Sequence, residues 1–539
     1  MGTLTSQTHT LGLLVVGCAE VALALYLRLR IFIGSQPGGV DTWYYLASAK
    51  AIRTQKRLPI SLPQYLLHDK TESYPPVFPL FLAALPQAWL RRYFWLVSPL
   101  IDTAHLLLLY VLSYRLTESV LAAGVAGLIY AVTPQLISET RNLNGRAFAS
   151  LLATIAMLVL LRSILPEPGV TARLFGSSEV GLWVVAIVLI ALLYNTHTST
   201  TIALLVSTLT LTVVFGEPRF LLAGVLGLPV AILISGGYYV RVIANHLHAA
   251  RFWRRNIAFT RAHQVADSPV LGTSNGTSRP AGRGQGLYRS GLRSTVWLCV
   301  RLIGENPFMI ALLFVQPPGE EWGGHMYWWA AAVMAWAVAT TLVRPLRIFG
   351  PGFHYMKASV FPSAYALAVI VNITEGLSVG RAAVLVCLLA SFAALAYFYR
   401  VMARRETEHT AHTPPDLAEA AAYLKSLPGR AVLVLPTMYA DFVAYAADKA
   451  VVWGGHSGDL RKLEEFFPVI RKPLGYFFAT YGVEYVLLDL AYTTPGEVHL
   501  EDNVEPLAAF GPIAVYGVTA KPSSATDQRQ PDSTSVPSR

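Results

Sequence analysis

The stretch "LGLLVVGCAEVALALYLRLRIFIGSQPGGVDTWYYL", residues 11–46, decides the fold class of this chain. Its first part, residues 11–33, is apolar over more than the roughly 20 residues that a helix needs to cross a bilayer. A Pro-Gly-Gly turn follows, and a single carboxylate, Asp41, then stands before the aromatic sequence "TWYYL". We therefore expect a first membrane-spanning helix, a polar loop, and an Asp41 that acts as the N-cap of the next helix.

The composition extends this interpretation to most of the chain. Of the 539 residues, 54% are hydrophobic and only 14% are charged, which is typical of a polytopic membrane protein. The N-terminus has no basic stretch or small-residue cleavage site, so its apolar run is expected to be a retained helix. The net charge is +10, but the basic residues lie in loops without a nucleic-acid-binding motif. Membrane lipids and lipid-linked phosphates are therefore the expected partners, and nucleic acid is not.

Hydropathy predicts a polytopic α-helical membrane protein with about 11–13 transmembrane helices. The clearest segments are 11–33, 93–114, 119–137, 147–164, 180–195, 201–216, 220–243, 294–315, 326–343, 355–373 and 382–400. Another apolar stretch, 76–90, is interrupted by two prolines and predicts a re-entrant or interfacial helix or one more span. The expected membrane domain covers 1–405 and has two long loops, 34–75 and 244–293.

The composition changes after residue 413. There the strand-like segments "AVLVL", "AVVW" and "VEYVLLDL" alternate with helix-like segments. This alternation predicts a small soluble α/β domain over 413–520. The last segment, 521–539, is polar and rich in Ser and Pro, and predicts a disordered tail.

An odd number of spans and a cytoplasmic N-terminus would place several polar segments on one outer face. These segments are the loops 34–75, 138–146, 195–200, 244–293 and 344–354, together with the C-terminal domain. Arg344 and Arg347 oppose this orientation, because short loops with basic residues tend to face the cytoplasm. We nevertheless expect the plasma membrane as the location, with the polar loops on its outer side.

Two of these outer segments carry candidate functional residues. "SETRNLNGR", residues 138–146, contains Glu139, Arg141 and Arg146, and its Asn-Gly turn is expected to bring them together. The turn "YNTHTST" contains one histidine, His197. Both segments also have an ordinary interpretation, as a polar loop and as a hydrogen-bonded loop histidine.

A third candidate segment is "RPLRIFGPGFHYMK", residues 344–357. Arg344 and Arg347 are three residues apart, and a Gly-Pro-Gly turn and His354 follow them. Guanidinium groups match phosphate oxygens in bidentate geometry, so this segment is suited to a lipid phosphate or pyrophosphate. Interfacial anchoring is the ordinary alternative.

Charges inside the expected spans form a further group, Glu20, Asp102 and Glu305. Carboxylates in a bilayer are costly and are functional candidates by default. We expect them instead to pair inside the helix bundle, with Ser, Tyr or His105.

The order of these motifs resembles the GT-C superfamily of integral membrane glycosyltransferases. The motifs are "DTWYYL", "YPPVFPLFLAALP", "AVTPQLISETRN", "THTST" and "HYMKASVFPSAYAL", followed by an α/β domain. The chain looks most like the catalytic subunits of archaeal and bacterial oligosaccharyltransferases and the related protein mannosyltransferases. The resemblance implies that Asp41 is an active-site carboxylate in the first outer loop.

The chain departs from the oligosaccharyltransferase pattern at two places. Glu139 is the only candidate for a second carboxylate, since "NGRAF" has Arg146 where an acid is expected. The "WWDYG" sequence is absent, and the nearest stretch is "MYADFVAY". These differences weaken the case for a Mg or Mn ion held by Asp41 and Glu139, and for recognition of an asparagine acceptor.

The function that the resemblance implies is transfer of a sugar from a polyprenyl-phosphate or polyprenyl-pyrophosphate donor. The acceptor is a glycan, a lipid or a protein at the outer membrane face. Asp41 and Glu139 are the expected catalytic residues, and His197 and His354 the expected contacts to substrate or metal. The expected ligands of the donor phosphate are Arg344, Arg347, Arg141, Arg146 and Arg241.

Three alternatives stay open at the level of sequence. One is protein glycosylation of the oligosaccharyltransferase type. The second is a lipid or solute transporter or flippase without covalent chemistry, which would use the carboxylates within the spans. The third is a scaffold whose outer domain binds partners.

Overall fold

The computed structural model describes most of the chain. The described residues are 2–33, 38–67, 72–165, 179–256, 292–319, 321–374, 376, 378–406, 414–454, 472–496, 498, 500 and 504–519. Two compact units make up the chain. The first contains Met1–Leu62, Thr71–Thr260 and Gly286–Thr413, and the second contains Pro63–Lys70, Arg261–Gln285 and Pro414–Arg539. The expected tail at 521–539 and most of the loop at 244–293 lie outside the described residues.

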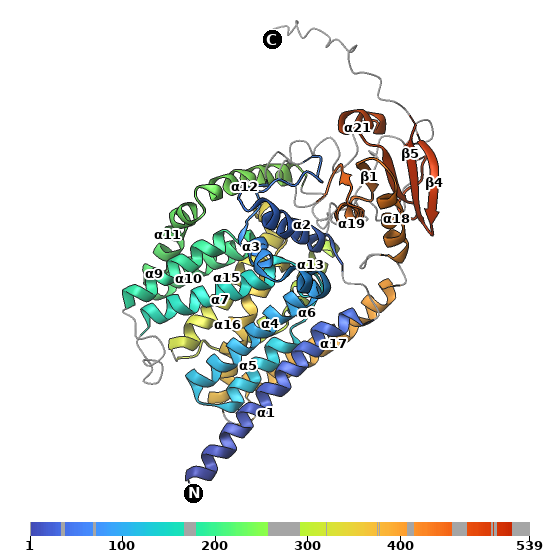
Figure 1. Cartoon of the computed structure of the whole chain (residues 1–539). Coiled ribbons are helices and arrows are strands. Elements are labelled where there is room, and N and C mark those ends of the chain that lie inside the picture. The colour runs from blue at the N-terminus through green and yellow to red at the C-terminus, as the bar shows by residue number, and fades with distance from the viewer. Residues whose placement is uncertain are drawn as a thin grey trace. The chain divides into compact units, whose positions relative to one another are not determined.

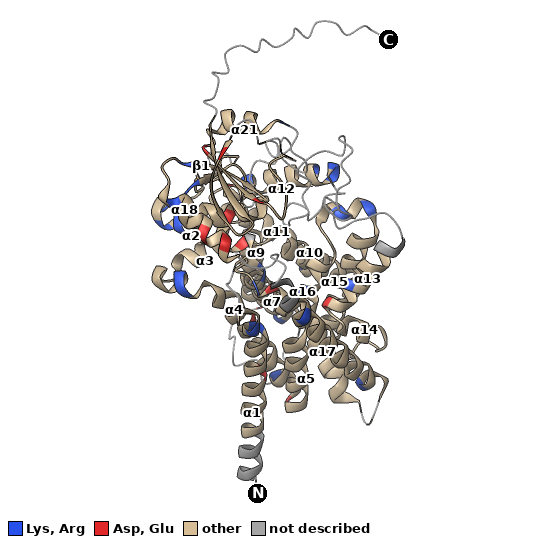
Figure 2. Cartoon of the chain, turned by 90° about the vertical axis from the view of Figure 1, so that its right-hand side faces the viewer, with Lys and Arg blue, Asp and Glu red and all other residues tan. Residues whose placement is uncertain are grey.

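Six helices of the first unit are long and apolar enough to cross a membrane, as far as the described residues go. They are Thr10–Phe32, Gln87–Thr117, Gly145–Ile164, Thr198–Phe215, Phe353–Ile373 and Val379–Val401. The long helices lie roughly side by side in Figure 1, and Figure 2 shows that most of their ribbon carries no charge. The chain is therefore a multi-pass integral membrane protein.

All the segments that hydropathy predicts are at least partly helical. The long helices are α1 (Gly2–Leu29, continued by η1, Arg30–Phe32), α4 (Gln87–Thr117), α7 (Gly145–Ile164), α10 (Thr198–Phe215), α15 (Glu321–Leu342), α16 (Phe353–Ile373) and α17 (Val379–Glu406). The shorter ones are α2 (Val40–Gln55), α3 (Val77–Ala84), α5 (Val120–Val132), α6 (Pro134–Glu139), α9 (Glu179–Tyr194), α11 (Arg219–Ile234), α12 (Tyr238–Arg255), α13 (Leu292–Glu305), α14 (Phe308–Leu313) and η5 (Arg344–Phe349).

The expected spans 119–137, 220–243 and 294–315 are not continuous helices, and the proline-interrupted stretch 76–90 contains only a short one. The first is divided into α5 and α6 at Thr133. α11 and α12 meet at an angle of 118°, because Gly236 and Gly237 take positive φ values of 58° and 83° between them. The expected span at 294–315 is divided into α13 and α14 at Pro307, which disfavours helix at the preceding residue. α3 has 8 residues and is too short to span.

α16 is the central helix of this unit, since 83% of its most apolar window is buried. It packs against α5 and α15, and its core residues are mostly small, aromatic or β-branched. A helix buried on nearly all sides has no lipid-facing surface on which a charge could reach the headgroups. Any ionisable side chain on α16 must therefore be matched inside the protein.

Of the three carboxylates within the expected spans, Asp102 pairs with a tyrosine as expected and also with Arg28, which the sequence did not indicate. Glu305 contacts Arg301 at 3.3 Å, and Glu20 is buried with no hydrogen-bond partner for its Oε2 among the described residues. Arg28 Nη2 lies 2.5 Å from Asp102 Oδ2, and Tyr130 donates to Asp102 Oδ1 at 2.9 Å. His105 lies beside them but pairs with Thr154 (2.9 Å) rather than with Asp102. Asp102 and Arg28 are both buried and paired with each other, so each charge is matched inside the protein.

The second unit contains a five-stranded sheet of order β2-β1-β3-β5-β4. Its elements are α18 (Pro415–Ser426), β1 (Ala431–Leu435), η6 (Thr437–Tyr439), α19 (Ala440–Ala446), β2 (Ala450–Val451), α21 (Leu474–Tyr481), β3 (Tyr485–Asp489), β4 (Val504–Phe510) and β5 (Ile513–Val518). β1 is parallel to β2 and β3, whereas β5 is antiparallel to β3 and β4. Tyr65, from the first long loop, forms a parallel bridge with Val451 at the β2 edge.

Candidate active site

The start of α2 fixes the first candidate residue. The N-cap is Gly39, with φ of 105°, and Asp41 lies in the first turn of the helix, so the expectation that Asp41 is the N-cap is wrong. Glycine is required at 39 for its positive φ, and also because a Cβ there would lie 2.7 Å from the side chain of Asn142. In the first turn Asp41 still benefits from the positive end of the helix dipole.

The loop between α6 and α7 fixes the next two residues. Asn144 Oδ1 caps α7 by accepting from the Arg146 amide at 2.9 Å, and Asn144 Nδ2 donates to the Glu139 carbonyl at 2.8 Å. This double contact holds the end of α6 against the start of α7. As a result Arg146 Nη1 lies 2.8 Å from Glu139 Oε2, as the turn at Asn144 predicts.

The two loops meet at Arg146. Its Nη2 lies 3.7 Å from Asp41 Oδ2, so one guanidinium group contacts both candidate carboxylates. Thr42 stabilises this arrangement, because its Oγ1 accepts from the Leu143 amide at 3.1 Å and donates to the Gly38 carbonyl at 2.9 Å. The charge cluster thus rests on backbone contacts as well as on its own side chains.

Lys357 completes the cluster and was missed at the level of sequence. It lies in the first turns of α16, is 4% exposed, and its Nζ has no hydrogen-bond partner among the described residues. It interacts electrostatically with Glu139, Arg146 and Asp41. The available signal was its position inside the expected span 355–373, where a charge is a functional candidate by default.

The surrounding charges shift the pKa values of Glu139 and His197. Burial alone would raise the pKa of Glu139, but the cations Arg146 and Lys357 outweigh it and hold this pKa below the ordinary value. Burial lowers the pKa of His197, and the same two cations lower it further. Glu139 is therefore ionised and His197 neutral at pH 7. His197 Nδ1 lies 3.1 Å from Thr200 Oγ1.

Two tyrosines border the cluster. The hydroxyl groups of Tyr45 and Tyr74 are 3.2 Å apart. Burial raises the pKa of Tyr74 to about 12, and it also raises the pKa of Tyr45; the negative charge of Asp41 acts in the same direction on both. Both hydroxyl groups are therefore protonated at neutral pH and serve as hydrogen-bond donors or acceptors.

The other predicted arginines and His354 have a less defined place. Arg344 is exposed on η5, and Arg347 donates through Nε to the Thr341 carbonyl at 3.1 Å, close to its own segment. Arg241 is exposed on α12, and Arg141 is half-buried in the turn between α6 and α7. His354, in the first turn of α16, interacts electrostatically with His197. The role of these residues in binding the donor stays a prediction.

The two departures from the oligosaccharyltransferase pattern have a structural counterpart. In "MYADFVAY" the buried Asp441 accepts a hydrogen bond from Tyr65 at 2.7 Å, within the second unit. In the described part of the chain, no group of three or more His, Cys, Asp or Glu residues is arranged to hold a metal ion. At the Asp41–Glu139 pair the contacting group is the guanidinium of Arg146.

The fold is that of the GT-C integral membrane glycosyltransferases, as solved structures show. No protein-family model and no curated protein sequence matches the chain. ArnT from Cupriavidus metallidurans bound to undecaprenyl phosphate is similar with a TM-score of 0.57 and 12% identity, over 94% of this chain and 97% of that one.

The archaeal oligosaccharyltransferase AglB from Archaeoglobus fulgidus is also similar. Its complex with an inhibitory peptide and a dolichol-phosphate gives a TM-score of 0.51 and 13% identity, over 89% of this chain and 69% of that one. Its complex with Zn and sulfate gives a TM-score of 0.51 and 15% identity, over 88% and 68%. The expected GT-C fold is thereby confirmed, and a divalent cation is compatible with that fold.

Proposed function

We propose that this chain is a membrane glycosyltransferase that moves a sugar from a polyprenyl-phosphate or polyprenyl-pyrophosphate donor to an acceptor. The observation that carries the proposal is Lys357, a buried lysine whose Nζ has no hydrogen-bond partner among the described residues, beside a carboxylate pair bridged by Arg146. A buried cation of this kind is stabilised by an incoming anion. The fold neighbours bound to undecaprenyl phosphate and dolichol-phosphate support a lipid phosphate as that anion.

In the proposed reaction Asp41 acts as the general base. An acceptor hydroxyl attacks the anomeric carbon from the face opposite the donor phosphate, and its proton passes to the Asp41 carboxylate. The bond between the anomeric carbon and the phosphate oxygen breaks, and the phosphate leaves with the electron pair. The product has the inverted anomeric configuration.

The leaving phosphate gains negative charge in this step. Lys357 is placed to bind it, because its Nζ has no hydrogen-bond partner among the described residues. Cations held in place before the reaction stabilise such charge more in the transition state than in the ground state. Arg146 orients Asp41 and Glu139 and adds positive charge to the same region.

A Mg or Mn ion at Asp41 and Glu139 fits these residues poorly. Hard cations prefer several oxygen ligands, and here both carboxylates face one guanidinium group and share their surroundings with Lys357. A divalent ion would have to displace Arg146 and would then lie close to two other cations. We therefore assign the positive charge of the site to Arg146 and Lys357.

The proposed location is the plasma membrane, with the active site and the 413–520 domain on the outer face. The four segments that supply Asp41, Glu139, His197 and Lys357 all come from ends of predicted spans that share one face, which supports a single site there. The acceptor class, whether glycan, lipid or protein, is left open by this chemistry, and transfer to a protein asparagine is the alternative.

A direct test is binding of undecaprenyl phosphate to the purified full chain in nanodiscs. We expect the wild type to bind it and Lys357→Met to bind it much more weakly. Arg115→Met, an exposed cation in the last turn of α4 for which no role in donor binding is predicted, is the matched control for the loss of a positive charge. Equal affinity of Lys357→Met and the wild type would contradict the assignment of Lys357.

A further inference from the structure

Helix α12 leaves α11 at a sharp bend and differs from it in composition. α11 has no charged residue after Arg219, whereas α12 contains four arginines and no aspartate or glutamate. The two helices meet at an angle of 118°, and Figure 1 shows α12 turning away from α11. Because so many charges would be costly in the hydrocarbon, α12 does not continue α11 through the bilayer but lies along its surface.

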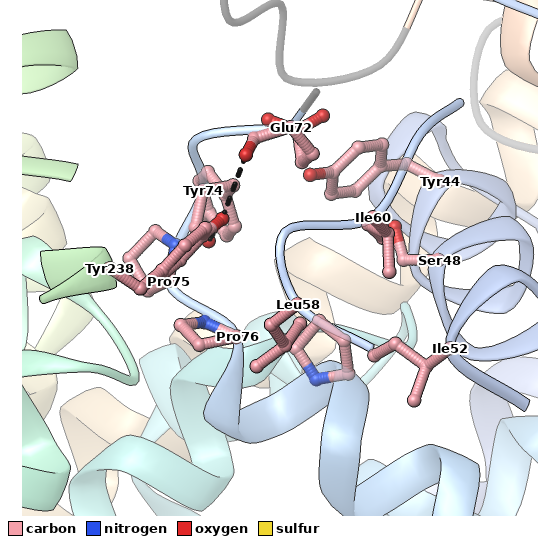
Figure 3. Close-up of a pocket in the computed structure, with 11 residues that line it drawn as sticks. Tyr44, Ser48, Ile52, Leu58, Ile60, Glu72, Tyr74, Pro75, Pro76 and Tyr238 are labelled. Carbon is pink, nitrogen blue, oxygen red and sulfur yellow. Dashed lines mark hydrogen bonds between the residues drawn. The ribbon is translucent and has the colours of Figure 1, made fainter. Parts of the chain in front are cut away.

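Two contacts place α12 at the membrane boundary where α16 begins. α12 packs against η5, which connects α15 to α16. At the start of α12, the Tyr238 hydroxyl lies within hydrogen-bond distance of the Glu72 and Tyr74 carbonyls, at 3.0 and 2.9 Å. Figure 3 shows Tyr238 beside these residues, which lead into α3. Since α16 is long and apolar enough to span the bilayer, η5 and α12 lie near the level at which α16 enters it.

The two faces of α12 differ in burial. One face packs into the protein, and its buried residues are Tyr238, Tyr239, Val242 and Phe252. On the other face Val240 and Leu247 are 52% and 57% exposed, and Arg251 and Arg254 are exposed as well. Successive members of this exposed series are seven, four and three residues apart, so their side chains follow one ridge of the helix. This ridge is apolar in its first half and cationic in its second.

η5 extends the ridge with the same combination of side chains. Arg344 is exposed, and Val343 and Phe349, at the two ends of η5, are 46% and 43% exposed. Because η5 packs against α12, cations and apolar side chains of both segments lie at one membrane boundary.

The helix dipole alone does not explain where the arginines of α12 lie. A dipole favours cations in the last turn, which holds Arg254 and Arg255, but it disfavours them near the start, where Arg241 lies. The row from Arg241 to Arg254 is about 20 Å long, at the rise per residue of an α-helix. Cations spread over this length match several phosphate groups side by side and exceed what one lipid headgroup can contact.

We propose that the exposed face of α12, extended by η5, binds the headgroups of anionic phospholipids at the membrane boundary where α16 begins. Guanidinium groups pair with the phosphate oxygens in bidentate geometry, while Val240 and Leu247 contact the acyl chains. The long arginine side chains reach from the helix to the headgroups over their own apolar stems. These phospholipids are structural partners rather than substrates, so Arg241 and Arg344 have a partner other than the donor phosphate.

Electron spin resonance of spin-labelled phospholipids tests this surface, because it measures the fraction of lipid that a protein immobilises. The full chain is reconstituted in phosphatidylcholine vesicles, with spin-labelled phosphatidylglycerol or phosphatidylcholine as the probe. We expect the wild type to prefer phosphatidylglycerol by roughly twofold or more, and Arg251→Gln with Arg254→Gln to lose about half of this preference. Arg251→Lys with Arg254→Lys keeps the charges and should keep the preference. Lys425→Gln with Arg430→Gln removes two exposed cations from the second unit and should leave the preference unchanged.

Two further arms separate the outcomes. Salt at about 1 M shortens the Debye length to about 3 Å and should remove the preference of the wild type; a preference that persists would contradict binding through charge. If equimolar undecaprenyl phosphate displaces the phosphatidylglycerol probe, the surface belongs to the donor and the proposal is wrong. Absence of a preference in the wild type would also overturn it, as would an unchanged preference in an Arg251→Gln, Arg254→Gln variant with the helix content of the wild type.

Discussion

Two buried charge clusters of the first unit differ in how completely they are satisfied. In the Arg28–Asp102 pair the carboxylate contacts Arg28 and Tyr130, and Arg28 also donates to the carbonyls of Ala24 and Ala131. In the second cluster Arg146 contacts Asp41 and Glu139, while the buried ammonium group of Lys357 has no hydrogen-bond partner among the described residues. In the first cluster the two opposite charges are matched one to one, although Arg28 Nη2 makes only the ion pair; in the second, Arg146 faces two carboxylates and the Lys357 Nζ lacks a hydrogen bond, so we expect the second to receive a ligand.

The largest expected effect is on the chemical step. Asp41→Asn keeps the shape of the side chain but removes the base, so transfer should fall roughly 100- to 10,000-fold. Sugar transfer from undecaprenyl-phosphate mannose to the membrane extract of the native host measures it. The thermal unfolding midpoint is the control and should not change. Retained turnover would remove Asp41 from the mechanism.

The corresponding change in the Arg28–Asp102 pair should affect stability rather than the chemical step. Asp102→Asn leaves Arg28 buried without its counter-ion, which costs roughly 3–5 kcal/mol. The unfolding midpoint in nanodiscs should drop, while the KM for the donor in the remaining folded protein stays near that of the wild type. A normal midpoint together with lost transfer would reverse the roles given to the two clusters.

Lys357→Met should weaken ligand binding without lowering stability, the opposite of what is expected for Asp102→Asn. Loss of a charge-assisted contact weakens binding of undecaprenyl phosphate by roughly 1.5–3 kcal/mol, or about 10- to 150-fold in Kd. The unfolding midpoint of the ligand-free protein should stay the same or rise, because a buried cation is replaced by an apolar side chain of similar length. Isothermal titration and thermal unfolding measure the two quantities.

The pH dependence of stability should reflect His197. Its pKa is lowered well below 6.5 in the folded protein, so the unfolded chain binds more protons as pH falls below 6.5. Folding is then destabilised on acidification by at most roughly 1.4 kcal/mol per pH unit for this one group. His197→Gln should reduce the loss of unfolding free energy between pH 6.5 and pH 5. An unchanged slope would show that His197 is protonated in the folded protein.

The smallest expected effect is that of metal removal. Since Arg146 already contacts both carboxylates, EDTA should leave the initial rate of sugar transfer unchanged, and excess Mg or Mn should not increase it. A rate that falls with EDTA and returns with either ion would show that a divalent cation displaces the guanidinium group.

Hydropathy could predict the helical fold because bilayer thickness imposes a minimum length of apolar sequence. It could not place the break before Pro307 or the bend at Gly236, which depend on local backbone preferences within apolar runs. Strands β4 and β5 were also missed. β4 contains Pro506 and is mostly exposed, whereas β5 is apolar and mostly buried and could have been found from its sequence.

The candidate site was predicted in part. Asp41 follows the first apolar run in the long loop 34–75, and Glu139 and Arg146 lie in a short polar loop, so the sequence indicates all three. Their contact depends on the Asn144 cap, which the Asn-Gly turn suggested. Lys357 was not predicted, because the sequence does not show that α16 is buried on nearly all sides, which is what makes a lone lysine there a strong signal.

The start of α2 also has a consequence for how the sequence can vary among related chains. Gly39 needs its positive φ and the space beside Asn142, and Thr42 accepts from the Leu143 amide, so the start of α2 and the loop before α7 constrain each other. Substitutions in one of these segments should therefore occur together with substitutions in the other.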